Sequence, residues 1–243
     1  MYSGVGQIET SNQSKSMIVP TMTLEEVANQ YQGDYGDLLA KRKFFQPKFS
    51  SLVKRSSRFP LKVQYEYTSH TNHNKYIFCY SAAKRGEWNE PHCIIIGVFD
   101  RPEGKYAVSS TNAGHTFLIY PPHFFARYRE RILKDDDIHG IELIKRFFRE
   151  NDRFIKEPLT EAHTKAYQKY ESDNESFQAA RCAEGNIFLE IQSYKVVVIK
   201  TIISDEMLFE EQKEAFSRMA DKLEAAKDIR LTVFPRDTDK PRF

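Results

Sequence analysis

One stretch decides how this chain is organised, and it reads Thr116-Phe-Leu-Ile-Tyr120-Pro-Pro-His123-Phe-Phe-Ala-Arg127-Tyr-Arg-Glu-Arg131-Ile-Leu133. Its first five residues form the kind of apolar run that is found in strands. Proline suits the first turn of a helix, so Pro122 predicts a helix that continues to Leu133. The stretch therefore predicts a strand that leads directly into a helix.

Strand patterns dominate the chain before this junction. Aromatic, β-branched and alternating side chains predict strands over residues 61–68, 75–82, 92–99, 106–109 and 116–120. The connections between them are short and hairpin-like, which favours an antiparallel meander. Further upstream, Thr23-Leu-Glu-Glu26 forms a capping-box pattern that predicts a helix through about residue 32. Residues 36–57 are expected to hold a second helical region, broken near Pro47.

Helices and then strands follow the junction. Apolar residues at helical spacing predict a helix over 137–151, and a more polar helix is expected over 160–170. Strands are predicted again over 176–183, 187–192 and 195–203, and a helix from Ser204 to about residue 226. This order predicts an α+β fold: an antiparallel sheet, built from a meander and C-terminal hairpins, with a helical layer and a helical N-terminal extension. The expected division is a flexible tail (1–20), a basic helical extension (21–60), an α+β domain (61–226) and a C-terminal tail (227–243).

The composition is that of an ordinary soluble protein. The 243 residues suffice for a substantial core, with 40% hydrophobic and 29% charged residues. The longest uncharged apolar run, Cys93 to Phe99, is too short to span a bilayer. The N-terminus lacks the blocks of a secretory signal, and three cysteines without paired spacing indicate a reduced compartment. We therefore expect a cytoplasmic protein without a membrane partner.

His123, Arg127 and Arg131 follow one another at intervals of four residues, so on a helix they form one polar stripe. An imidazole titrates near neutral pH and can act as a general base, and guanidinium groups bind phosphate with fork geometry. The stripe therefore suits chemistry at a phosphate. The structural alternative is a solvated face on which the arginines pair with nearby acidic residues while His123 caps the helix.

The order of elements from residue 115 to 203 resembles a group of small bacterial toxin-like domains. The resemblance is carried by the strand, the His-x-x-x-Arg-x-x-x-Arg-Ile helix, the acidic turn Asp135–Asp137, a second helix and a hairpin that ends in Val196-x-x-Ile-Lys-Thr201. Such domains are similar to the fold shared by barnase, colicin-type and RelE-type ribonucleases. Two features depart from the family pattern: Ile203 replaces an aromatic residue, and the span 152–175 is longer than these domains need.

The resemblance implies a metal-independent endoribonuclease whose catalytic residues are His123, Arg127, Arg131 and Thr201. His115 and Tyr128 are additional site candidates. RNA is then the expected partner, a neutralising protein partner is an open alternative, and no cofactor or metal is expected. The competing class is a non-enzymatic module that holds nucleic acid or an acidic protein on a basic surface.

A second basic feature runs from Lys41 to Lys62, where eight basic residues occur without an acidic one. Its candidate nucleic-acid-binding residues are Lys41, Arg42, Lys43, Lys54, Arg55 and Arg58. Phenylalanines lie between them, and cations with aromatic rings suit single-stranded nucleic acid. The alternative is an amphipathic helix whose phenylalanines pack on the core.

Other chemistries have weak support in the sequence. His70 and His73 could ligate a metal together with Cys79 and Cys93, but no Cys-x-x-Cys pair occurs. Nor does the sequence contain a Gly-rich phosphate loop, a Gly-x-Ser-x-Gly motif or a His-Glu-x-x-His motif. Nucleotide hydrolysis, serine hydrolysis and zinc proteolysis are therefore unsupported.

Overall fold

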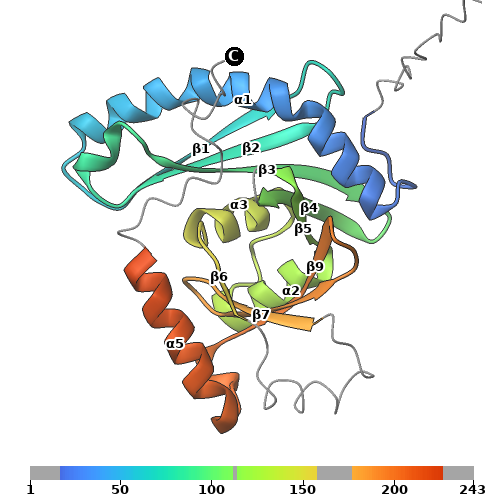
Figure 1. Cartoon of the computed structure of the whole chain (residues 1–243), viewed down its shortest axis with the longest axis vertical. Coiled ribbons are helices and arrows are strands. Elements are labelled where there is room, and N and C mark those ends of the chain that lie inside the picture. Colours follow the sequence, from blue (N-terminus) through green and yellow to red (C-terminus); the bar gives the residue numbers. More distant parts are fainter. Residues whose placement is uncertain (1–16, 112–113, 158–176, 227–243) are drawn as a thin grey trace, which may run out of the picture.

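The computed structural model describes residues 17–111, 114–157 and 177–226, and one nine-stranded sheet organises them (Figure 1). The strands are β1 (Leu61–Thr68), β2 (Lys75–Ala82), β3 (His92–Arg101), β4 (Gly104–Thr111), β5 (Thr116–Tyr120), β6 (Ile155–Glu157), β7 (Phe177–Arg181), β8 (Asn186–Ile191) and β9 (Val196–Ile203). The helices are α1 (Leu24–Arg55), α2 (Pro122–Tyr128), α3 (Gly140–Glu150) and α5 (Glu210–Ala226). Short helical turns are η1 (Arg85–Trp88), η3 (Arg129–Leu133) and η4 (Asp205–Met207).

The α+β class predicted from the sequence is confirmed, but the sheet is mixed. Its strand order is β1-β2-β3-β4-β5-β9-β8-β7-β6. Neighbouring strands of the described sheet run antiparallel except β5 and β9, which pair in parallel through Phe117–Ile119 and Val196–Val198. The prediction of a purely antiparallel sheet was therefore wrong. A parallel pair needs a long crossover, and the chain between β5 and β9 provides one.

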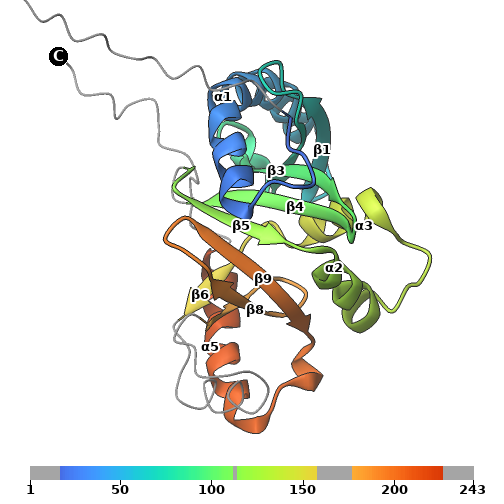
Figure 2. The same cartoon turned by 90° about the vertical axis from the view of Figure 1, so that its right-hand side faces the viewer.

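The sheet separates two helical layers (Figures 1 and 2). Alternate residues of β2 show this directly, because side chains of a strand point to opposite faces in turn. Phe78 joins the cluster that α1 contributes to, whereas Ile77 and Cys79 join the cluster formed by α2 and α3. The strand β2 is thus buried on both faces, and α1 lies across the sheet from α2.

Helix α1 is continuous, although a break near Pro47 was predicted. Its first turn has the predicted capping box, in which Thr23 and Glu26 bond to each other's backbone. Proline removes one backbone donor. The helix nevertheless continues, because Phe45 and Phe49 on either side of Pro47 are buried against the sheet. This packing also confirms the amphipathic alternative for these two phenylalanines.

The loop between β1 and β2 is tied to α1 by one carboxylate. Asp34 is fully buried. It accepts hydrogen bonds from Ser69 Oγ (3.0 Å), Asn72 Nδ2 (2.9 Å), Asn74 Nδ2 (2.8 Å) and Tyr76 Oη (2.7 Å). Because three of these donors come from the loop, this polar segment, where a histidine metal site had been considered, has an evident structural role.

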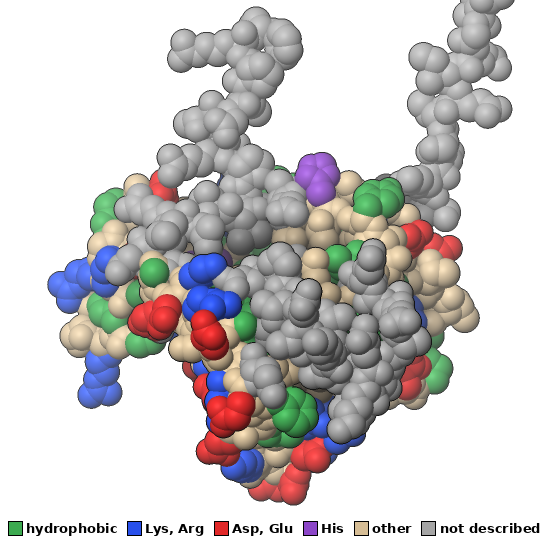
Figure 3. Space-filling view, turned by 60° about the horizontal axis from the view of Figure 1, so that its bottom comes forward, with side chains coloured by type: hydrophobic (Ala, Val, Ile, Leu, Met, Phe, Trp, Pro, Cys, Tyr) green, Lys and Arg blue, Asp and Glu red, His purple; other side chains and the backbone are tan. Residues whose placement is uncertain are grey.

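The C-terminal elements form a smaller cluster at the end of the sheet opposite β1. Phe216 and Met219 of α5 are buried with Phe188 of β8. Acidic and basic side chains are intermixed on the face that Figure 3 shows.

The polar helix predicted over 160–170 lies outside the described residues, as do the parts of the predicted tails before residue 17 and after residue 226. Among the described residues, no helix is both long and apolar enough to cross a bilayer.

Candidate active site

Helix α2 begins directly after β5, as predicted, and its buried side sets its orientation. Phe124, Phe125 and Tyr128 are buried in the cluster that includes Phe147 of α3. Successive side chains on a helix point in different directions, and His123 and Arg127 each directly precede a buried residue. His123 and Arg127 are therefore exposed on the outer side of α2.

The predicted helix changes its winding before Arg131. Residues Arg129–Leu133 form a π-helical turn that ends at Lys134 in the left-handed conformation, with φ at 51°. Single π turns inside helices occur frequently at functional sites. This turn brings Arg131 to the end of β9, where its Nη1 donates to Thr201 Oγ1 (3.0 Å) and to the Ile202 carbonyl (3.3 Å).

A bulge in β9 lies at the same place. Phe188 pairs with Thr201 but Leu189 pairs with Ile199, so Lys200 is an extra residue in the ladder. The paired part of β5 ends opposite Val198, and α2 contacts β9. The bulge and the helix thus bring Lys200 and Thr201 to the residues of the sequence motif. Bulges are common next to active sites.

The four predicted catalytic residues and Lys200 form one group, which we call the His/Arg cluster (His123, Arg127, Arg131, Lys200 and Thr201). Partial desolvation of the His123 ring lowers its pKa below the ordinary value of 6.5, and the charges of Lys200 and Arg127 lower it further, while the Lys200 backbone opposes the shift. Burial and the charge of Arg127 likewise lower the pKa of Arg131. Mutual repulsion of this kind means that positive charges converge here, and His123 is held toward its neutral, proton-accepting form.

Two carboxylates offset part of this charge. Glu130 lies 2.7 Å from Arg127 on the exposed side of the helix, and Glu190 lies 3.0 Å from Lys200. The structural alternative predicted that both arginines pair with nearby acidic residues, and Arg127 does so. Arg131 differs, because it bonds to a hydroxyl and a carbonyl. Asp136 of the acidic turn lies 3.9 Å from Arg129.

Tyr128, an additional candidate, lies on the buried side of α2. Its hydroxyl donates to Glu184 Oε2 (2.5 Å), and Glu184 also accepts from Arg146 Nη2 (2.9 Å) and Asn151 Nδ2 (2.7 Å). Burial raises the pKa of Tyr128 far above its ordinary value, and the bond to Glu184 raises it further. This network fastens α2 to α3 and to the turn before β8, so Tyr128 has a positioning role.

His115, the other additional candidate, is not brought to the cluster. It precedes β5 whereas His123 follows it. Five residues of strand span roughly 16 Å. His115 is exposed at the far end of β5.

The predicted nucleic-acid-binding residues are also separate from the cluster. Lys41, Arg42, Lys43, Lys54 and Arg55 belong to α1, and Arg58 follows it. Because α1 and α2 cover opposite faces of the sheet, the structure presents two basic surfaces, not one. Neither Lys200 nor Glu190 was predicted as a site residue, although Lys200 directly precedes Thr201 in the sequence motif.

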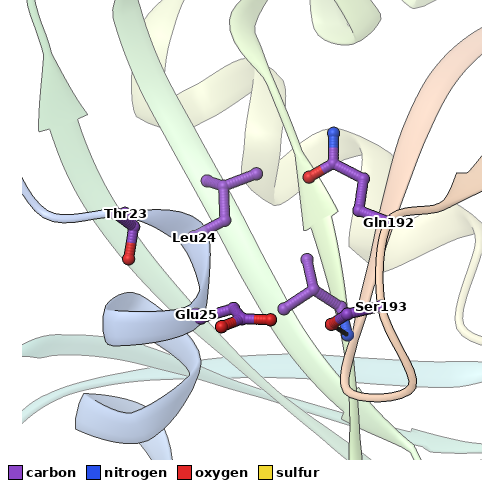
Figure 4. Close-up of a pocket in the computed structure, with 6 residues that line it drawn as sticks. Thr23, Leu24, Glu25, Gln192 and Ser193 are labelled. Carbon is purple, nitrogen blue, oxygen red and sulfur yellow. Dashed lines mark hydrogen bonds between the residues drawn. The ribbon is translucent and has the colours of Figure 1, made fainter.

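A shallow pocket of about 310 Å³ lies elsewhere, between the start of α1 and the turn joining β8 to β9 (Figure 4). Its lining residues are Thr23, Leu24, Glu25, Gln192, Ser193 and Val196. None of them belongs to the predicted site. Within the part of the chain that the structure describes, no group of three or more His, Cys, Asp or Glu side chains is placed to hold a metal ion.

The His/Arg cluster is thus the place where the sequence motif and the geometry coincide. Its chemical capacity is that of an anion site: permanent cations, a neutral imidazole and a hydroxyl within one group. Comparisons with protein-family models, with curated proteins and with solved structures find no match to this chain.

Proposed function

We propose that this protein binds RNA and cleaves it without a metal, in the manner of the toxin-like ribonucleases that its sequence resembles, through the His/Arg cluster. The observation that carries the proposal is the contact of Arg131 with Thr201 (3.0 Å). Two residues 70 positions apart, both named by the sequence motif, lie within hydrogen-bonding distance.

The chemistry assigns a separate task to each side chain. His123 accepts the proton of a ribose 2′-hydroxyl, and the oxygen attacks the adjacent phosphorus. The bond from phosphorus to the 5′ oxygen breaks, solvent protonates that oxygen, and the product carries a 2′,3′-cyclic phosphate. Arg127 and Lys200 stabilise the charge that develops on the phosphate, and Arg131 and Thr201 hold it in place.

A labelled RNA oligonucleotide incubated with the protein in excess EDTA tests this function. We expect cleavage of the RNA, and no cleavage of an oligonucleotide of the same sequence with 2′-O-methyl groups, because the attacking hydroxyl is blocked. Cleavage of both substrates, or dependence on added metal, would rule out the proposed chemistry.

The competing function is a non-enzymatic RNA-binding surface at the same cluster. One observation favours it over catalysis: Arg127 is paired with Glu130 at 2.7 Å, so this cation is not free to stabilise a transition state. Under that function the protein binds both oligonucleotides with similar affinity and cleaves neither.

Glu130→Gln is expected to raise RNA affinity, because it releases Arg127 and removes a negative charge from the surface. An exposed pair contributes about 0.2–1 kcal/mol, so we expect tighter binding by roughly 1.4- to fivefold at low salt. Fluorescence anisotropy with the 2′-O-methyl oligonucleotide measures this without cleavage. Glu142→Gln is the matched control, since Glu142 pairs at the same helical spacing with Lys145 on α3. Equal effects of both variants would show that Arg127 does not contact RNA.

The rate of cleavage should rise with pH through the pKa of His123 and level off above it. Because that pKa is lowered, the midpoint is expected below 6.5. Positive charge on Lys200 disfavours the imidazolium, so Lys200→Gln is expected to move the midpoint upward. A pH profile of kcat/KM measures it, with Lys195→Gln, at the other end of β9, as control. A downward shift would contradict the proposed electrostatics.

A further inference from the structure

Strand β1 forms the margin of the described sheet that lies farthest from α5 (Figures 1 and 2). All eight of its residues pair with β2 on one side. Within the described residues, no strand pairs with the other side. In such a strand, alternate backbone N–H and C=O groups point outward and form a template for another strand.

Helix α1 presents apolar side chains beside this edge. Phe44 and Leu52 are large hydrophobic residues with exposed fractions of 52% and 43%. The Lys41 ammonium lies 4.5 Å from the centre of the Phe44 ring and 4.8 Å from that of Tyr67 on β1. Phe44 therefore lies close to β1. Lys48 falls between Phe44 and Leu52, so the three follow one another at intervals of four residues along one side of α1.

The positive charge along this side of α1 favours one kind of binding partner over others. No acidic residue occurs between Lys41 and Tyr65. A second copy paired by two-fold symmetry would bring the basic side of one α1 (Lys41, Lys48 and Arg55) against the same basic side of the other, which is repulsive. The Phe44 ring carries two ammonium groups, Lys48 at 4.1 Å and Lys41 at 4.5 Å, where a nucleic-acid base would have to stack. An extended acidic polypeptide avoids the like-charge repulsion, and unlike a nucleic acid it can form backbone hydrogen bonds with the edge of β1.

The geometry points to a binding site for an extended, acidic segment of a partner protein, which adds to β1 as an antiparallel strand. Its backbone bonds to the edge of β1, its apolar side chains pack on Phe44 and Leu52, and its carboxylates pair with Lys48 and Arg55. This site is on the α1 face of the sheet, so it does not depend on the His/Arg cluster of α2.

A displayed library of random ten-residue peptides, selected on the 243-residue chain, tests the site. We expect enriched sequences in which apolar and acidic residues share every second position, because only alternate side chains of an added strand face α1. Hydrogen exchange of the β1 amides should slow when such a synthetic peptide is bound. N-methylation of one alternate set of peptide amides should abolish binding, whereas N-methylation of the other set should not.

Matched variants locate the site without disturbing the core. Lys48 and Lys54 are both exposed on α1, but the Lys54 ammonium lies 3.7 Å from the Trp88 ring of η1, away from Phe44. Lys48→Glu should weaken binding of the selected peptide by about tenfold and Lys54→Glu by less than about twofold. Phe44→Ala should also weaken binding about tenfold through lost apolar contact.

Three outcomes would overturn the inference. The first is enrichment of peptides with helical spacing or basic residues, and the second is equal loss of binding in Lys48→Glu and Lys54→Glu. The third is occupation of the edge by something else, shown by a dimer in sedimentation that Phe44→Ala dissociates, or by single-stranded RNA displacing the peptide.

Discussion

His123→Ala is expected to slow RNA cleavage by roughly 10²- to 10⁴-fold, the range for a positioned acid or base, while RNA affinity changes by less than about threefold. The cleavage rate and the RNA affinity are expected to respond differently because His123 carries little charge at pH 7. The lowered pKa of His123 keeps the imidazole largely neutral at pH 7, so its removal takes away a proton acceptor but little phosphate attraction. Cleavage of a labelled oligonucleotide and anisotropy with its 2′-O-methyl analogue measure the two quantities independently.

His115→Ala is the matched control for this prediction. Both histidines are exposed, and β5 separates them, so loss of His115 should leave cleavage unchanged. If the two variants lose activity equally, the catalytic base is not specific to the His/Arg cluster. If His123→Ala weakens affinity as much as it slows cleavage, the histidine binds RNA but does not activate the hydroxyl.

The start and orientation of α2 were predictable because their causes are local. Pro122 occupies the first turn, and Phe124 and Phe125 form the buried side that leaves His123 outside. The π turn was not predictable, because residues 129–133 contain no pattern that distinguishes it from an α-helix. The π turn is accompanied by the hydrogen bond from Arg131 to Thr201 of β9. These residues are 70 positions apart, so their contact does not follow from any local sequence pattern.

The pairing of the strands in the sheet was likewise not predictable from local patterns. Residues 116–120 and 196–203 carry clear strand patterns, but an apolar run does not specify its partner or direction. Nor does a strand pattern show that Lys200 forms a bulge, because the extra residue is defined only by the register against β8. The motif thus identified the catalytic candidates, whereas the positions of Lys200 and Glu190 beside them depend on the register of β8 and β9 and could not be predicted.

Asp34→Ala is expected to lower the free energy of unfolding by about 3–5 kcal/mol, a large fraction of the 5–15 kcal/mol typical of a domain. An aspartate within a helix is ordinarily solvated, but this one is fully buried and accepts four hydrogen bonds. Its removal leaves four donors without their acceptor, and each unsatisfied buried group costs roughly 1–3 kcal/mol before the structure relaxes. Urea denaturation followed by circular dichroism measures the loss.

Asp37→Ala separates this effect from a general cost of changing an aspartate on α1. Asp37 is half-buried and accepts two bonds, from Tyr67 Oη (2.6 Å) and the His70 backbone (2.7 Å). Because water can reach those donors, we expect a loss of only about 1 kcal/mol. Asp34→Asn should also be costly, since its amide nitrogen would face donors where an acceptor is needed. If Asp34→Ala cost no more than Asp37→Ala, the β1–β2 loop would not depend on the buried carboxylate, and the attachment of α1 to the sheet would have to come from its apolar side alone.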